Sequence, residues 1–106
     1  MKTYDLYGCV DSELETVRQT VEELLRIAME KHESSYRGGD YYRHGADGSE
    51  NFILQSNYNT FEGEWTKEQY KEYPFLLYVN ETSRSGDIEK KLGSTSKVKL
   101  LQRKTL

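Results

Sequence analysis

The chain has 106 residues, of which 35% are hydrophobic and 31% are charged, and its formal net charge is −3. This length fits one domain, and nine Tyr, three Phe and one Trp are more aromatic residues than a disordered segment carries. Cys9 is the single cysteine, so the composition excludes an intramolecular disulfide and a zinc site built from several cysteines.

No apolar run approaches the 20 or so residues of a membrane span, and the first residues lack the apolar stretch of a secretory signal. A lone cysteine also fits a reducing compartment. We therefore expect a single domain over residues 1–106, located in the cytoplasm and without membrane contact.

The first elements follow from the apolar pattern. Residues 3–9 alternate as a strand does. Ser12, with Glu15 three residues later, has the spacing of a capping box, and Lys31 and His32 suit the negative end of a helix dipole. Between them, apolar residues recur at helical spacing at Leu14, Val17, Val21, Leu24, Leu25 and Ala28. The pattern predicts one long helix that ends near His32.

The middle of the chain alternates turns and extended segments. Gly38-Gly39 predicts a turn or bulge, and Tyr41-Tyr42 favours extended structure. Residues 44–49 form a predicted turn into a second strand over about 50–58, which is followed by a polar loop over 59–65.

A second capping-box spacing, Thr66 and Gln69, predicts a short helix that Pro74 ends. Three elements follow: a central strand over 75–79, a short helix with Ile88 and Leu92 inward and Gly93 as its cap, and a last strand over 98–101 that frays into a basic tail. The order β-α-β-β-(α)-β-α-β predicts an α+β fold, with a mixed, mostly antiparallel sheet and one long helix on a face. The closest simple topology is a ferredoxin-like variant.

Residues for catalysis or metal binding are scarce. His32 and His44 belong to no metal-ligand spacing, and Gly38-Gly39-Asp40 lacks the pattern of a phosphate loop. Cys9 precedes the long helix, a position that lowers a thiol pKa, but acidic neighbours oppose this and a buried structural cysteine is preferred. We expect no enzyme activity, no cofactor, no metal and no small-molecule substrate; a nuclease using His44 with Tyr41, Arg37 or Arg43 is the alternative to test.

Charge is unevenly distributed along the sequence. Residues 44–66 contain Asp47, Glu50, Glu62 and Glu64 without a single Lys or Arg, whereas six cations and no acid follow Glu89. Such an arrangement steers association with a charged partner, although ordinary solvated faces give the same pattern.

A segment rich in Tyr and Arg precedes the acidic run, and these residue types dominate protein interfaces. Tyr36, Tyr41 and Tyr42 with neighbouring arginines would also stack nucleic-acid bases, but the net charge and the acids that follow favour a basic protein partner. The predicted partner-binding residues are Tyr36, Arg37, Asp40, Tyr42, Arg43, Asp47, Glu50, Tyr58, Glu62, Glu64 and Trp65. Part of the Tyr set is expected in the core.

Three stretches carry a family resemblance: S-Y-R-G-G-D-Y-Y-R at 35–43, F-I-L-Q-S-N-Y at 52–58 and Y-P-F-L-L-Y-V at 73–79. With the small size and acidity, the chain resembles the cytosolic immunity proteins of bacterial contact-dependent growth inhibition and related polymorphic toxin systems. The resemblance implies neutralisation of one cognate toxin domain, commonly a nuclease with a basic cleft. It implies either occupation of that cleft or binding beside it, and assigns no role to an individual residue.

Overall fold

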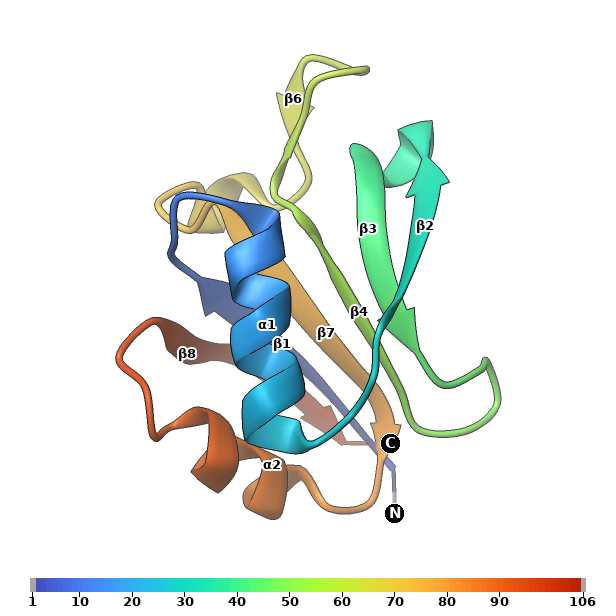
Figure 1. Ribbon diagram of the computed structural model, residues 1–106, viewed down its shortest axis with the longest axis vertical. Coiled ribbons are helices and arrows are strands. Elements are labelled where there is room, and N and C mark those ends of the chain that lie inside the picture. Colours follow the sequence, from blue (N-terminus) through green and yellow to red (C-terminus); the bar gives the residue numbers. More distant parts are fainter. Residues whose placement is uncertain (1, 106) are drawn as a thin grey trace.

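The computed structural model describes residues 2–105, which form two α-helices, a six-stranded sheet and a two-stranded hairpin (Figure 1). The helices are α1 (Leu14–Leu25) and α2 (Ser85–Leu92); the strands are β1 (Thr3–Cys9), β2 (Glu30–Ser34), β3 (Gly39–His44), β4 (Asn51–Ser56), β5 (Tyr58–Asn59), β6 (Glu64–Trp65), β7 (Phe75–Thr82) and β8 (Val98–Thr105); two 3₁₀ turns are η1 (Ser35–Arg37) and η2 (Glu68–Tyr70). The predicted α+β class is confirmed. No helix within residues 2–105 is long and apolar enough to cross a membrane.

The large sheet has the strand order β2-β3-β4-β7-β1-β8, and each neighbouring pair is antiparallel. Strands β2, β3, β4 and β7 form a meander, with the β5–β6 hairpin inserted between its last two strands. β1 then lies between β7 and β8, which α2 connects. The coarse prediction of a mostly antiparallel sheet is confirmed, whereas this order does not confirm a ferredoxin-like arrangement.

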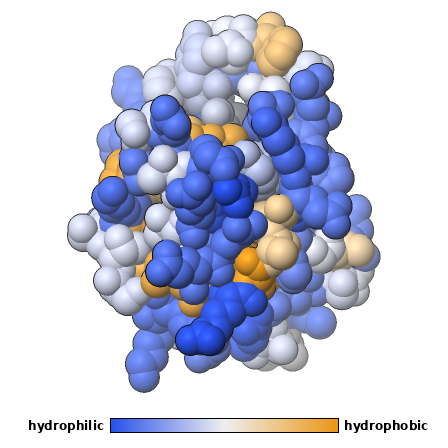
Figure 2. Space-filling view, viewed as in Figure 1, coloured by the Kyte–Doolittle hydropathy of each residue, from blue (hydrophilic) through white to orange (hydrophobic). Residues whose placement is uncertain are grey.

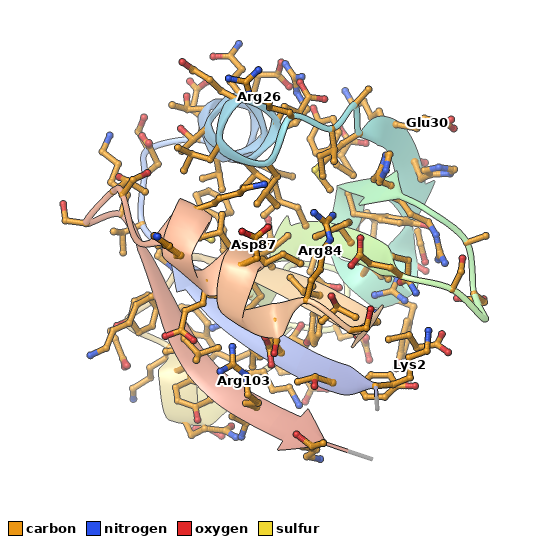
Figure 3. All side chains as sticks on the ribbon, turned by 90° about the horizontal axis from the view of Figure 1, so that it is seen from below. Lys2, Arg26, Glu30, Arg84, Asp87 and Arg103 are labelled. Atoms are coloured by element: carbon orange, nitrogen blue, oxygen red, sulfur yellow. The ribbon has the colours of Figure 1, made fainter. Side chains whose placement is uncertain are left out.

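Both helices lie on one side of the sheet, and the core lies between them and it (Figure 3). Each helix contributes one apolar stripe: Val17, Val21 and Leu25 from α1, and Ile88 and Leu92 from α2, all at most 4% exposed. Their outward side is largely hydrophilic (Figure 2). The predicted inward face of the second helix is therefore confirmed, because its apolar residues are four positions apart and share a face.

The long helix is shorter than the apolar pattern predicts. α1 ends at Leu25, where Arg26 adopts a left-handed conformation (φ 55°, ψ 48°), and the Glu22 carboxylate accepts a hydrogen bond from the Met29 N–H at 2.7 Å. Lys31 and His32 therefore do not lie in a helix but in β2, opposite Tyr42 and Tyr41. A strand replaces the predicted end of the helix here, and it pairs with β3 from Glu30↔Arg43 to Ser34↔Gly39.

Neither predicted capping box forms. α1 begins after Glu13 without a side-chain cap, and Glu15 accepts hydrogen bonds from Arg18 and Tyr42 instead. The segment after Thr66 forms only the 3₁₀ turn η2, which also lacks a side-chain cap of its own.

Two strand predictions also change. The strand predicted over 50–58 is divided into β4 and β5 at Asn57, and the loop predicted over 59–65 contains the paired residues of β5 and β6. The last strand continues through the predicted tail to Thr105, because it pairs with β1 as far as Thr3↔Thr105. Arg103 there also binds Asp5 and Glu89, with nitrogen–oxygen distances of 2.9 and 3.0 Å.

Candidate protein-binding site

The chain leaves the large sheet after β4 and forms a projecting hairpin at one end of the molecule (Figure 1). Tyr58 of β5 pairs with Trp65 of β6, and their rings meet edge to face with centroids 5.1 Å apart. A two-stranded hairpin is only marginally stable by itself, so contacts with the rest of the protein must hold this one.

Asn59, which is 3% exposed, ties the hairpin to the turn η1. Its side-chain nitrogen donates to the backbone oxygens of Ser35 and Tyr36 at 2.9 and 3.2 Å. Its side-chain oxygen accepts from the backbone N–H groups of Phe61 and Glu62 at 2.9 and 3.2 Å. One amide therefore fixes two loops that are distant in sequence in a defined relative position.

Asn57 plays the matching role for the segment that returns to the sheet. It is fully buried, and its amide nitrogen donates to the carbonyls of Tyr70 and Tyr73, both at 3.0 Å. Its oxygen accepts the Lys67 N–H at 2.8 Å. Lys67 is the residue directly before η2, so this contact fixes the point at which the turn begins.

Aromatic side chains gather where η1 and the hairpin meet. Tyr36 is 78% exposed, Phe61 65% and Tyr58 41%; within residues 2–105 the only other exposed large hydrophobic residue is Val10, at 38%. We call this surface the aromatic end and define it as Tyr36, Tyr58, Phe61 and Trp65 together with the carboxylates of Glu62 and Glu64.

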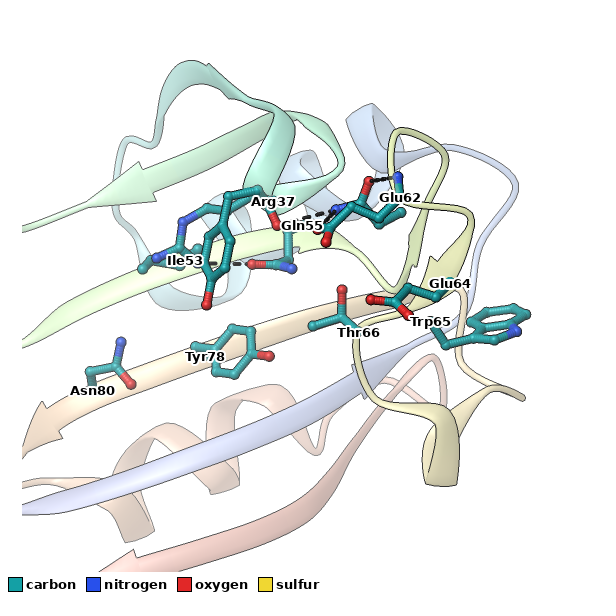
Figure 4. A pocket seen from close by; sticks show the side chains of 11 residues that line it. Arg37, Ile53, Gln55, Glu62, Glu64, Trp65, Thr66, Tyr78 and Asn80 are labelled. Atoms are coloured by element: carbon teal, nitrogen blue, oxygen red, sulfur yellow. Dashed lines mark hydrogen bonds between the residues drawn. The ribbon is translucent and has the colours of Figure 1, made fainter.

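A cavity of about 410 Å³ lies beside the aromatic end, on the face of the sheet opposite the helices (Figure 4). Its floor is formed by side chains of β4 and β7, including Gln55, Tyr78 and Asn80. Its two walls are η1, with Tyr36, and the hairpin, with Glu64. The aromatic end is thus hollowed rather than flat, as a receptor for a protruding side chain would be.

Arg37 stands inside this cavity without a carboxylate partner among residues 2–105. Its guanidinium donates to the Gln55 side-chain oxygen at 2.9 Å and lies over the rings of Tyr41 and Tyr36, 5.3 and 6.0 Å from their centroids. Burial raises the pKa of Tyr78 on the cavity floor, and the charge of Arg37 opposes part of that increase. The phenol therefore stays protonated and able to donate a hydrogen bond at neutral pH.

The structure brings six of the predicted partner-binding residues together: Tyr36, Arg37, Tyr58, Glu62, Glu64 and Trp65. It places the other five elsewhere. Asp40 pairs with Lys31, Arg43 with Asp47, and Glu50 with Arg84, so these charges are neutralised within the chain. The structure corrects the prediction that Tyr42 binds a partner. Successive residues of β3 alternate between the two faces of the sheet, and Tyr42 points under α1. It is 7% exposed there, and its hydroxyl donates a hydrogen bond to Glu15 at 2.5 Å.

Sequence reasoning missed Phe61, the two asparagines and the cavity floor. The sequence does contain a feature that points to Phe61, since it is the one apolar residue in the polar stretch N-T-F-E-G-E at 59–64. Asn57 and Asn59 had a weaker one, because Asn often hydrogen-bonds backbone in turns. Tyr78 and Asn80 had none, because only strand pairing determines what lies opposite a residue of β7.

Of the side chains considered for catalysis, His32, Arg43 and His44 line a common cavity of about 390 Å³, whereas Cys9 lies apart from them. Cys9 is fully buried, and burial raises the pKa of its thiol to about 12, so it does not supply a thiolate at neutral pH; the preferred interpretation of a structural cysteine is confirmed. His44 places Nδ1 2.8 Å from the Ala28 backbone oxygen, and His32 stacks on Tyr41. No group of three or more His, Cys, Asp or Glu side chains within residues 2–105 is arranged to hold a metal ion.

No protein-family model matches the chain, and no curated protein matches it either. Its function is therefore inferred from the residues themselves.

Proposed function

We propose that the chain is a protein-binding module that neutralises a cognate toxin domain, and that the aromatic end is its binding surface. The observation that carries the proposal is the concentration of exposed aromatic residues at one place, Tyr36, Tyr58 and Phe61, with Trp65 packed against Tyr58. Aromatic side chains exposed in a group are typical of binding surfaces, because covering them with a partner releases water from a large apolar area.

The aromatic end is preorganised, which favours tight binding. Asn59 makes two hydrogen bonds to the backbone of η1 and two to the backbone of its own hairpin, so little conformational entropy remains to be lost on association. Tyr and Trp side chains also lose few rotamers when an interface orders them.

The charge of the partner surface follows from which acids remain unpaired. Asp47 and Glu50 are bound to Arg43 and Arg84, and both carboxyl pKa values are lowered by those partners. Glu62 and Glu64 form no ion pair among residues 2–105 and flank the aromatic residues. A partner with basic groups around an apolar centre therefore fits, and the basic cleft of a nuclease toxin has that character.

The resemblance to immunity proteins supplies the biological role. An inhibitor whose projecting end carries aromatic anchors and two carboxylates would enter a basic cleft and exclude its anionic substrate. It would equally bind beside the cleft and block access sterically, and both modes use the same surface.

The test uses the protein encoded directly upstream of this chain in its own genome, with its C-terminal domain expressed under an inducible promoter. We expect that domain to arrest growth and co-expression of the chain to restore it. The double variant Tyr36→Ala, Phe61→Ala should weaken binding, measured by calorimetry, by roughly thirtyfold or more, since each interface anchor contributes more than about 1 kcal/mol. Val10→Ala, which removes the exposed hydrophobic residue outside the aromatic end, is the matched control.

Two results would contradict the proposal. A neighbouring gene whose product causes no growth defect removes the toxin role. Full protection and unchanged affinity in the double variant, with its fold verified by circular dichroism, would move the binding surface away from the aromatic end.

A further inference from the structure

A second cavity lies next to the one beside the aromatic end, on the same face of the sheet. The second cavity measures about 140 Å³ and shares Tyr78 and Asn80 with the first. Its other walls come from β1, β8 and the segment before η2, through Tyr4, Gln102, Lys104 and Lys67. We call the two cavities together the trough; it lies over β4, β7, β1 and β8 on the face that the helices leave uncovered, and Tyr78 and Asn80 line both of its parts. Figure 4 shows the first part.

The register of the strands explains why these side chains line up. Ile53 of β4 pairs with Tyr78 of β7, Tyr78 with Leu6 of β1, and Leu6 with Gln102 of β8. Residues directly opposite one another in a sheet point to the same face, so this row crosses the sheet at right angles to the strands. The trough follows that row.

Three cations and two acids that form no ion pair among residues 2–105 line the trough, so its excess of positive charge lies in the second cavity. Arg37, Lys67 and Lys104 line it, and none of the three forms an ion pair in the part of the chain that the structure describes. Asp5 borders the second cavity, but its carboxylate lies on the helix side, bound to Arg103 at 2.9 Å. The remaining acids, Glu62 and Glu64, stand at one end.

Flat rings and amides alternate with these cations. Tyr36, Tyr78 and Tyr4 are spaced along the trough, and the amides of Asn80 and Gln102 line it, whereas Gln55 is buried and bound to Arg37. Aromatic rings stack on bases, amides bond base edges, and Lys or Arg bind phosphate; together these groups are the elements of single-strand recognition. An acidic peptide would use the cations, but it does not offer a flat base beside every charged group as a nucleic acid does.

We propose that the trough binds single-stranded nucleic acid, with bases over Tyr4 and Tyr78 and phosphates at Arg37, Lys67 and Lys104. This activity goes beyond the toxin-neutralising function and does not depend on it, although Tyr36 and Arg37 lie where the two surfaces meet. The site differs from the Tyr36–Tyr42 segment that the sequence suggests, because Tyr42 is in the core.

The test measures fluorescence anisotropy of a labelled oligo-dT of about ten nucleotides, a typical length for one binding domain, with the full chain at several salt concentrations. Binding at low salt should weaken with added salt, and log K should fall against log salt with a slope of about −2, since each of three phosphate contacts contributes about 0.7. Lys67→Ala and Lys104→Ala should each make the slope shallower by about 0.7. Lys71→Ala and Lys90→Ala, which remove exposed lysines outside the trough, should leave it unchanged.

Stacking is tested separately from charge. Tyr4→Leu should weaken binding roughly tenfold at constant salt, within the range measured for loss of one stacked base, whereas Tyr4→Phe should retain it. Thermal unfolding of each variant verifies its fold, and the Phe variant keeps the comparison valid if the Leu variant is unstable.

Three outcomes overturn the proposal. The first is no binding at low salt, and the second is a slope that the trough lysines do not alter. The third is equal binding of an abasic oligonucleotide of the same length or full displacement by polyglutamate, either of which would identify the trough as a general polyanion or acidic-protein site.

Discussion

Asn57 and Asn59 hold a long excursion of the chain that has little hydrophobic core of its own. Both are at most 3% exposed, and their side chains replace the backbone pairing that a longer sheet would provide. A buried amide with all its hydrogen bonds made is stabilising and specific, whereas removal of one partner leaves the others unsatisfied.

Asn59→Ala should lower the free energy of unfolding by about 2 kcal/mol, because it leaves buried backbone groups of η1 and the hairpin without partners. It should also weaken partner binding, since the hairpin loses its fixed position. Urea denaturation measures the first effect, and Thr60→Ala, an exposed neighbour, is the control with an expected change within about 0.5 kcal/mol. Equal stability of the two variants would contradict the role assigned to Asn59.

Because Cys9 is buried, we expect the stability of the protein to depend on pH in the alkaline range. Burial raises the pKa of the thiol to about 12 in the folded protein, whereas an unfolded chain releases the proton near pH 8.5. The group's contribution to stability is therefore complete below about pH 8.5 and falls as the pH rises above it. The difference in denaturation midpoint between the unaltered protein and the variant Cys9→Ala should be smaller at pH 10 than at pH 7.

Thiol accessibility provides an independent measurement for the same residue. An aromatic disulfide reagent at pH 8 should react slowly with the native protein and at once in denaturant. Rapid reaction with the native protein would show that solvent reaches Cys9, and would support the alternative that Cys9 is a nucleophile.

At the scale of elements, the turn between β3 and β4 offers a matched pair of glycines. Gly45 and Gly48 both have positive φ, 86° and 89°, but a Cβ at Gly45 would lie 2.3 Å from the Glu50 backbone oxygen, whereas one at Gly48 meets nothing within 4 Å. Gly48→Ala should cost about 1–2 kcal/mol from backbone strain alone. Gly45→Ala should cost clearly more, as measured by urea denaturation, and equal costs would rule out the steric difference.

Helix ends show where local signals fail. The spacing of Ser12 and Glu15 predicts a capping box, but Glu15 bonds Arg18 and Tyr42, which is twenty-seven residues away in sequence. Near Thr66, the backbone N–H that Gln69 would bind in a capping box donates to the Asn57 backbone oxygen, and the next N–H, of Lys67, donates to the Asn57 side-chain oxygen. In both places a tertiary partner replaces the local one, and no sequence spacing encodes such a partner. The inward face of α2 and its Gly93 cap were predictable, because they depend only on residues within the helix and at its end.

At the scale of the whole molecule, pairing reduces the apparent charge asymmetry. Of the four acids between residues 44 and 66, Asp47 and Glu50 are neutralised, and only Glu62 and Glu64 remain to steer a partner. The basic end of the sequence is similarly divided, since Arg103 is bound internally while Lys104 faces the trough.

The double reversal Glu62→Lys, Glu64→Lys should slow association with the toxin domain, by roughly tenfold at low salt, and change the dissociation rate less, because unpaired charges at a rim act mainly on encounter. Stopped-flow measurement over a salt series tests this. Glu13→Lys, Glu23→Lys makes the same change of net charge on the helix side and is the control. An unchanged association rate in the first variant would remove both carboxylates from the steering surface.

The sequence by itself determined the elements whose cause is local: β1, the apolar stripe that begins α1, the buried strand β7 and the short helix α2. It also indicated the region of the candidate site, because aromatic and acidic residues are concentrated there. Only the tertiary structure decided which of them act together. Strand register placed Tyr42 in the core and Tyr78 in the trough, and two buried asparagines joined η1 to the hairpin. The physical reason is that burial, charge pairing and hydrogen bonding depend on contacts between residues distant in sequence. The local sequence pattern indicates only the properties of each residue and its near neighbours.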